Sequence, residues 1–140
     1  MAVLLLASAC GGEGRMGKQD YEQQLNDAGR RLSAVFGTID ENRQNLKQLA
    51  VRVRRARRTL DATAAELAKV KPPERAQAAH GRVVTALEGL SVDLERIARA
   101  ADANDEQAVT RARAQLRAPA EELTASFREL QRAGFAINSG

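Results

Sequence analysis

The single histidine of the chain, His80, is a side chain able to act as a general base or a metal ligand near neutral pH. Glu74 and Glu88 lie within eight residues of it and would be its nearby carboxylate partners. Stable metal sites use three or four ligands, and no second histidine is present. We therefore expect His80 to be partly buried beside an apolar stripe or to form a capping hydrogen bond. A metal- or small-ligand site built from His80 and nearby carboxylates is the alternative.

Cys10 is the only cysteine, and it follows a short apolar segment without charge. Residues 2–6 form an apolar core and residues 7–9 are small, as at the cleavage site of a signal peptide. The string LASAC at residues 6–10 resembles the lipobox of bacterial lipoproteins. In that family the cysteine receives a diacylglycerol and becomes the new N-terminus after cleavage. The resemblance implies that Cys10 is the lipidation site and that residues 1–9 are a signal peptide.

The lipobox departs from the usual pattern in two ways. Ala7 stands where leucine is more common, and no basic residue precedes the apolar core. Because signal peptides begin with a basic region, we expect the true translation start to lie upstream of Met1. Residues 10–19 are then the lipidated cysteine and a flexible tether, since four of the residues 11–17 are glycine. Residues 20–140 form the folded domain. The alternative is an apolar N-terminal element with a buried, unmodified Cys10.

The densest charge feature of the chain is a run of arginines at positions 52, 54, 55, 57 and 58. In a helical projection Arg54, Arg55 and Arg58 face away from the apolar stripe, and Arg57 lies near its edge. The structural interpretation is a solvated face with intrahelical partners. The functional interpretation is contact with anionic lipid or with a polyanionic envelope polymer. Nucleic acid is not expected as a partner, because no aromatic stacking platform accompanies the arginines.

Length and composition exclude several classes of protein. The chain has 140 residues, a net charge of +4, 44% hydrophobic residues and 3% aromatic residues, which fits one globular domain rather than a disordered tail. No stretch approaches the roughly 20 apolar residues of a spanning helix. A single cysteine excludes an intrachain disulfide framework. No phosphate-binding loop or nucleophile–base pair is visible, so we expect no catalytic residue, no metal site and no cofactor.

Good helix formers dominate from residue 20 onward, and no stretch alternates like a strand. We expect four helices: from near Asp20 to Gly37, from there to about Val70, over 74–102 and over 106–133. Each carries one apolar stripe, which is typical of a bundle. The larger stripe residues are Tyr21, Leu25, Leu32, Val35, Phe36, Ile39, Leu46, Leu49, Val53, Leu60, Leu67, Val83, Val84, Leu87, Leu90, Leu94, Ile97, Val109, Leu116, Leu123, Phe127 and Leu130. Short connections predict an antiparallel up-and-down bundle of four helices.

Local signals mark the expected ends of these helices. Gly37 favours a helix end, and Thr38 with Glu41 fits a capping box, although three helices with a long first one bent near residues 37–42 is the alternative. Pro72 and Pro73 separate the second helix from the third. The end signals further along the chain are an N-cap at Asp105 (with Asp102 as the alternative), a kink at Pro119, a C′ residue at Gly134 and a clasp of Phe135 and Ile137.

With these elements placed, the chain resembles a group of small actinobacterial lipoproteins. Besides the lipobox, the resemblance is carried by Tyr21, Asn26, Phe36, Leu67, Pro72-Pro73, Ala79-His80 and Ala136-Ile137-Asn138. It implies a helical fold and a location at the outer face of the cell membrane, and it carries over no catalytic residue. We therefore expect a non-enzymatic binding or interaction module, held on the membrane by its lipid anchor, whose protein partner the sequence does not identify.

Overall fold

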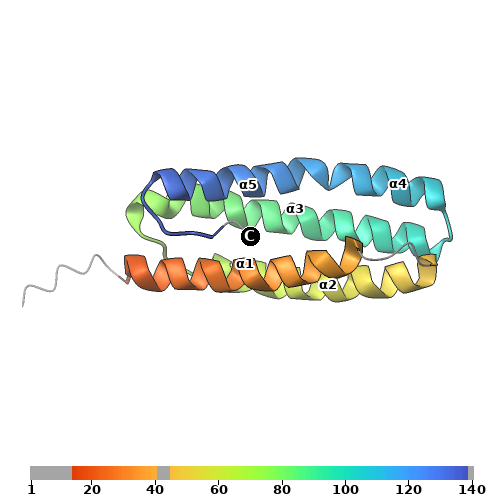
Figure 1. Ribbon diagram of the computed structural model, residues 1–140, viewed down its shortest axis with the longest axis horizontal. Helices are drawn as coiled ribbons and strands as arrows, with labels where there is room; N and C mark the ends of the chain where they lie inside the picture. Colours follow the sequence, from red (N-terminus) through yellow and green to blue (C-terminus); the bar gives the residue numbers. More distant parts are fainter. Residues whose placement is uncertain (1–13, 41–44, 139–140) are drawn as a thin grey trace, which may run out of the picture.

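The helices of the protein form an antiparallel bundle. The computed structural model describes residues 14–40 and 45–138, and within these ranges it contains helices and no strand. The rods are α1 (Lys18–Asp40), α2 (Leu46–Ala68), α3 (Gln77–Asp102) and α4 (Glu106–Gln115) continued by α5 (Arg117–Arg132) (Figure 1). A single 3₁₀ turn, η1 (Glu74–Ala76), leads into α3. No helix of the described ranges is long and apolar enough to cross a membrane. The predicted four-helix bundle is confirmed.

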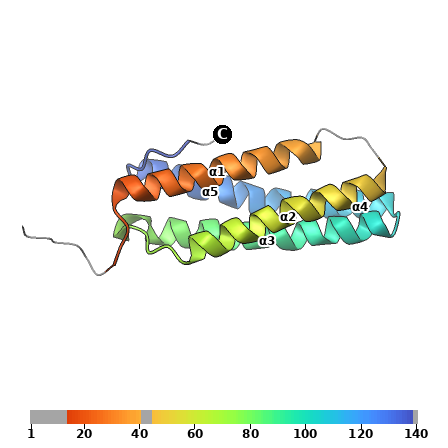
Figure 2. The same ribbon diagram turned by 90° about the horizontal axis from the view of Figure 1, so that it is seen from below.

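The first two helices are separate, so the alternative of one long bent helix is wrong. They lie side by side and run in opposite directions (Figures 1 and 2). The side chain of Asn45 caps α2 by accepting a hydrogen bond from the backbone N–H of Gln48 at 3.0 Å. The predicted break at Gly37 is also wrong, because α1 continues through Gly37 to Asp40. An exposed glycine costs a helix only about 1 kcal/mol, which the packing of its apolar neighbours outweighs.

The other predicted helix starts need small corrections. The first helix begins at Lys18, so Asp20 lies in its first turn instead of at its N-cap. Glu41, the expected partner of Thr38 in a capping box, lies outside the described residues. The helix expected over 74–102 begins as a 3₁₀ turn at residues 74–76, capped by Pro73, and is α-helical only from Gln77. These shifts stay within one turn, where local signals are weakest.

The core of the bundle has two parts that follow one another along its length. Helix α3 contributes to both, and it packs against α2, α4 and α5, whereas α1 packs chiefly against α2. The first cluster is centred on Tyr21, Leu25, Leu60, Leu67, Val83, Leu87, Leu130 and Phe135. The second, richer in alanine, comprises Leu49, Ala50, Val53, Ala56, Leu94, Ile97, Ala98, Ala101, Val109 and Ala112. The four stripes read from the sequence therefore meet in one interior.

The turn between α3 and α4 is as short as the sequence indicates. Asn104 adopts a left-handed conformation with φ 55°, which asparagine tolerates better than most residues. Asp105 then caps α4, because its side chain accepts a hydrogen bond from the N–H of Ala108 at 2.8 Å. The N-cap predicted at Asp105 is confirmed, and Asp102 remains inside α3.

The last rod is interrupted where a proline approaches. Pro119 has no N–H to donate one turn back, and the helix is broken at Leu116, whose own N–H turns to the carbonyl of Arg113 at 3.2 Å. The two pieces, α4 and α5, continue in nearly the same direction (Figure 1). The kink expected at Pro119 thus takes the form of a one-residue interruption three positions earlier.

The C-terminal end of α5 folds back on the bundle as predicted. Gly134 has φ 92°, and the N–H of Phe135 returns to the carbonyl of Leu130 at 3.1 Å, which is the hydrogen-bond pattern of a glycine-terminated helix. Phe135 and Ile137 are both buried in the first core cluster. The expected hydrophobic clasp is confirmed.

The segment 135–138 also ties the end of the chain to its first helix. Asn26 donates from its side chain to the carbonyl of Ala136 at 3.0 Å and accepts from the N–H of Asn138 at 2.8 Å. Glu22 accepts from the N–H of Ala136 at 2.8 Å. This segment lies between α5 and α1 (Figure 1), so α1 is held by α2 on one side and by the C-terminal segment on another.

A pair of glycine substitutions is expected to act in opposite directions. Gly134→Ala should destabilise the fold by about 1 kcal/mol, because a side chain is strained at φ 92°. Gly81→Ala should stabilise it by about 0.5–1 kcal/mol, since Gly81 lies within α3 and a Cβ there meets nothing within 4 Å. Urea unfolding of both variants measures the two effects, and equal signs would contradict the assigned backbone conformations.

Candidate functional site: a buried histidine and a basic helix face

His80 lies in the interior, where it joins three helices. It is 5% exposed, and its Nε2 is 2.8 Å from the backbone carbonyl of Leu67 in the last turn of α2. A carbonyl only accepts, so Nε2 carries the proton and Nδ1 accepts from the hydroxyl of Tyr21 at 3.0 Å. The capping role expected for His80 is confirmed, because it satisfies a carbonyl at the end of α2.

Tyr21 is a partner that sequence reasoning placed in the core but did not connect with His80. The two are 59 residues apart and meet only because α1 crosses the junction of α2 and α3. The Tyr21 ring also packs edge-on against Phe135, with ring centroids 5.4 Å apart. Burial raises the pKa of Tyr21, so its hydroxyl stays protonated and donates at all physiological pH values.

Acidification is expected to destabilise the fold between about pH 7 and pH 5. Burial lowers the pKa of His80 below its usual value, and the hydrogen bond to Leu67 opposes this only in part. The unfolded chain therefore binds a proton below about pH 6.5 that the folded chain does not, and stability falls with pH until the lower folded pKa is reached. Thermal unfolding of the wild type and of His80→Gln at pH 5, 6 and 7 measures the slope.

The variant should lose most of that slope while keeping any destabilisation that does not depend on pH. Glu66, Glu95 and Asp102 also have pKa values lowered by arginine partners, but they affect stability only below their ordinary values of about 4. They therefore do not act in the same window. An equal slope in wild type and variant would contradict the assignment to His80.

The carboxylates suggested as companions of His80 are not placed to share a ligand with it. Glu74 and Glu88 are both exposed, whereas His80 is buried with both ring nitrogens bonded to protein atoms. Across residues 14–40 and 45–138, no group of three or more His, Cys, Asp and Glu side chains could hold a metal ion. In this arrangement His80 has no free lone pair to offer.

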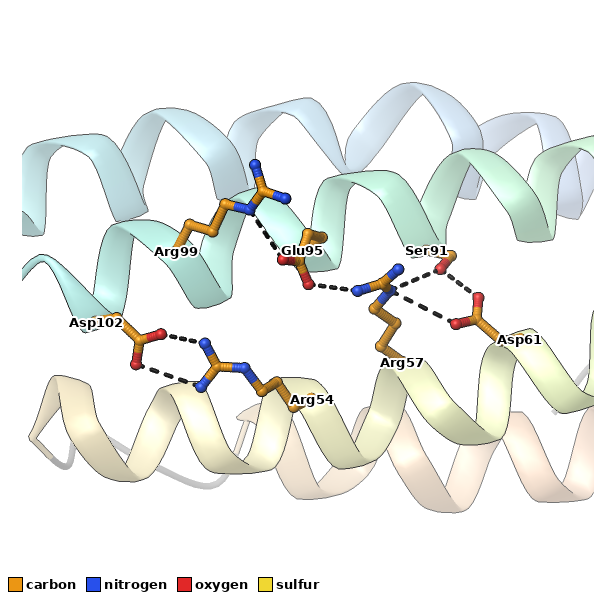
Figure 3. Close-up of polar contacts among 7 residues, drawn as sticks. All are labelled: Arg54, Arg57, Asp61, Ser91, Glu95, Arg99 and Asp102. Carbon is orange, nitrogen blue, oxygen red and sulfur yellow. Dashed lines mark hydrogen bonds and ion pairs between the residues drawn. The ribbon is translucent and has the colours of Figure 1, made fainter.

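Part of the arginine run forms a polar ladder between α2 and α3 (Figure 3). Arg57 donates to Ser91 and to Glu95 on α3, and it also pairs with Asp61 one turn further along α2. Glu95 is shared with Arg99, whose hydrogen bond is the main cause of its lowered pKa. The ladder joins the two helices at their exposed edge, where such pairs contribute little individually.

Arg54 belongs to this ladder, which corrects its position in the helical projection. Its guanidinium reaches α3 and binds both carboxylate oxygens of Asp102 (Figure 3). That hydrogen bonding lowers the pKa of Asp102. The helical projection placed Arg54 opposite the apolar stripe because it describes directions around one helix and not the position of the neighbouring helix. Arg55 and Arg58 do point away from the bundle, and neither forms an ion pair with a residue that the structure describes.

Arg55 and Arg58 are part of a longer row of exposed residues on α2, which we call the α2 row. Its members recur every three or four positions and so lie along one line of the helix surface. They are Lys47, Val51, Arg55, Arg58, Ala62, Ala65 and Lys69, all exposed. The sequence analysis did not identify Lys47 and Lys69, because they lie outside the dense run at 52–58 and are related to it only by their spacing along the helix.

The α2 row contains four cations and no carboxylate. Glu66, the acid nearest to Lys69 along the helix, is turned toward α1, where Arg31 binds it at 2.7 Å. A shallow hollow of about 340 Å³ opens at the other end of the row, with Lys47, Val51 and Arg55 in its lining. The row therefore carries four cations beside a small apolar surface. The nearest carboxylates, Asp61 and Glu66, pair with arginines outside the row, and Glu66 also feels the charge of Lys69.

The start of the described chain lies at the opposite end of this row. The N–H of Met16 donates to the carbonyl of Lys71 at 2.8 Å, just beyond the end of α2. The guanidinium of Arg15 donates to the carbonyl of Pro72 at 3.1 Å. Cys10 and the predicted signal segment lie outside the described residues. A flexible tether was predicted over residues 10–19, but residues 15 and 16 are bound beside the end of α2, and residues 18 and 19 already belong to α1.

Comparison of the chain with protein-family models, with curated proteins and with solved structures finds no match in any of the three.

Proposed function

We propose that the protein is a lipid-anchored helical bundle on the extracytoplasmic face of the cell membrane, where it acts as a non-catalytic binding module. The observation that carries this proposal is the context of Cys10. It is the only cysteine, it follows three small residues and an apolar segment, and glycines succeed it at once. Such a position suits attachment of two acyl chains, which hold a protein stably on a bilayer.

The described part of the bundle fits an anchor that lies before Gly14 in the chain. Among the described residues, the two core clusters draw their buried side chains from positions 21–137, and Met16 only packs at their edge. The first described residues bind the backbone next to α2 through Met16 and Arg15. The tether thus has a fixed point of entry.

The partners of His80 and of the ladder carboxylates favour a binding role over a catalytic one. His80 uses both ring nitrogens to connect helices, and the carboxylates of the ladder are paired with arginines. The alternative of a metal- or small-ligand bundle would need His80 to break its bond with Tyr21 or Leu67. A surface that recognises a partner needs no such rearrangement, and the exposed α2 row offers one.

Intact mass spectrometry and fractionation of the protein made in an actinobacterial host test the proposal. We expect a membrane-bound product whose mass shows loss of residues 1–9 and gain of a diacylglycerol on Cys10. A soluble product of full, unmodified mass would overturn it.

A further inference from the structure

We infer that the α2 row is a docking surface for anionic phospholipid headgroups, so that the bundle lies with α2 against the bilayer. This inference rests on the proposed function, because the lipid anchor supplies the membrane. It goes further by naming the partner of the module and the face that meets it.

The argument from charge compares the outward faces of the helices. On α1 the exposed Arg30 is paired with Asp27, and on α5 Arg117 is paired with Glu121. On α3 the exposed Arg96 and Arg99 are held by Asp93 and Glu95. Some arginines of α4 and α5 are also exposed without an ion pair among the described residues, but Arg113 shares its helix line with Glu106, and Arg128 shares its line with Glu121. The α2 row differs because it gathers four cations on one helix line that carries no carboxylate. Unpaired cations are the groups that anionic headgroups attract.

The argument from shape concerns what lies between the cations. The row runs the length of a 23-residue helix, which corresponds to about 34 Å, so it meets a surface along a line. Ala62 and Ala65 leave room for the longer arginine and lysine side chains to reach phosphates. Val51, 58% exposed beside the hollow, is one of two large apolar side chains that are exposed to solvent among the residues that the structure describes. Contact with headgroups would cover it.

The argument from the tether concerns distance. Cys10 is four residues from Gly14, so a chain of roughly 3.5 Å per residue keeps Gly14 within about 14 Å of the anchor. Gly14 lies next to Lys71, and Lys71 follows Lys69 at the end of the row. The anchor therefore holds one end of the row near the bilayer. Tethering raises the effective concentration of the α2 row at the bilayer, so a weak attraction by each cation is enough to keep the row docked there.

Vesicle co-sedimentation of the full-length Cys10→Ser chain tests the surface without the anchor. The probes are vesicles of 30% phosphatidylglycerol in phosphatidylcholine and vesicles of phosphatidylcholine alone. A variant with Lys47, Arg55, Arg58 and Lys69 all changed to Gln should partition at least tenfold less onto the anionic vesicles. Each cation near an anionic surface is worth about fivefold in binding, and screening reduces the sum.

The matched control removes four cations from the other side of the molecule. Arg111, Arg113, Arg128 and Arg132 on α4 and α5 are exposed, and their change to Gln lowers the net charge by the same amount. We expect this control to keep its binding to within about threefold. Equal losses in both variants, equal binding to both kinds of vesicle, or binding to a soluble polyanion such as polyphosphate without binding to vesicles would each overturn the inference.

The anchored protein separates this inference from the proposed function. The sulfur of lipidated Cys10 is a thioether, so in a Val51→Cys variant the new cysteine is the only free thiol that a fluorophore can label. Ala34→Cys, on the exposed face of α1, provides the matched control position. A headgroup nitroxide should quench the label at position 51 several-fold more than the label at position 34. Anchored protein with equal quenching would overturn the docking while leaving the anchor intact. Protein without acyl chains would overturn the proposed function, and the co-sedimentation would still decide the surface.

Discussion

A chain carrying Cys10→Ala is expected to leave the membrane fraction and to appear in the soluble fraction with its mass free of acyl chains. The reason is that two acyl chains dominate membrane affinity, whereas the cations of the α2 row add only weak, salt-dependent attraction. Carbonate-washed membranes and culture supernatant, compared by immunoblot and intact mass, measure the redistribution. We expect a change of at least tenfold in the ratio of bound to soluble protein.

The control for this experiment is Glu13→Gln, which changes the tether without touching the thiol and should stay on the membrane. Thermal unfolding of the Cys10→Ala chain should match that of the wild type, because the described core is built from residues 21–137. If Cys10→Ala remains in the washed membrane, the anchor is not a lipid on this residue. If the variant unfolds at a much lower temperature, Cys10 belongs to the fold.

Leu87→Ala is expected to cost about 3 kcal/mol of unfolding free energy and to lower the melting temperature by roughly 10 °C. Leu87 is fully buried in the middle of α3, and the cluster around it includes side chains of α1, α2 and α5. Truncation removes apolar burial and leaves a cavity that four elements cannot fill by moving together. Chemical denaturation with equilibrium fluorescence of an added label, or circular dichroism at 222 nm, measures the loss.

Val92→Ala on the same helix provides the comparison. Val92 is 52% exposed, so its truncation should change the unfolding free energy by less than about 0.5 kcal/mol. A small effect at Leu87 together with a large effect at Val92 would mean that α3 is rotated relative to its neighbours. The pair therefore tests the register of the central helix directly.

The sequence predicted the fold best where chemistry was local. Asp105 and Gly134 were identified because a capping carboxylate and a left-handed glycine act within a few residues. Gly37 misled the prediction because its cost is small beside the burial of the apolar residues around it. Pro119 indicated a disturbance in the last rod, but the interruption lies three residues earlier, at Leu116.

The site was predicted less well, because its contacts join distant parts of the chain. The capping role of His80 followed from its place beside a stripe, but its bond with Tyr21 depends on how α1 crosses the bundle. Arg54 was placed on the wrong side, since a projection of one helix contains no information about the next. Lys47 and Lys69 belong to a periodic row, which can be recognised only once α2 is known to be continuous and exposed on that line.

The way α1 is held has a consequence for the order in which backbone amides exchange with deuterium. Its bonds with the C-terminal segment join residues more than one hundred positions apart, so re-forming them requires closure of a long loop. Release of that segment and opening of α1 should therefore occur as one sub-global event, while α3, enclosed by α2, α4 and α5, stays protected until the whole chain unfolds. Protection is expected to be lost first at the two ends of the chain and last at its middle.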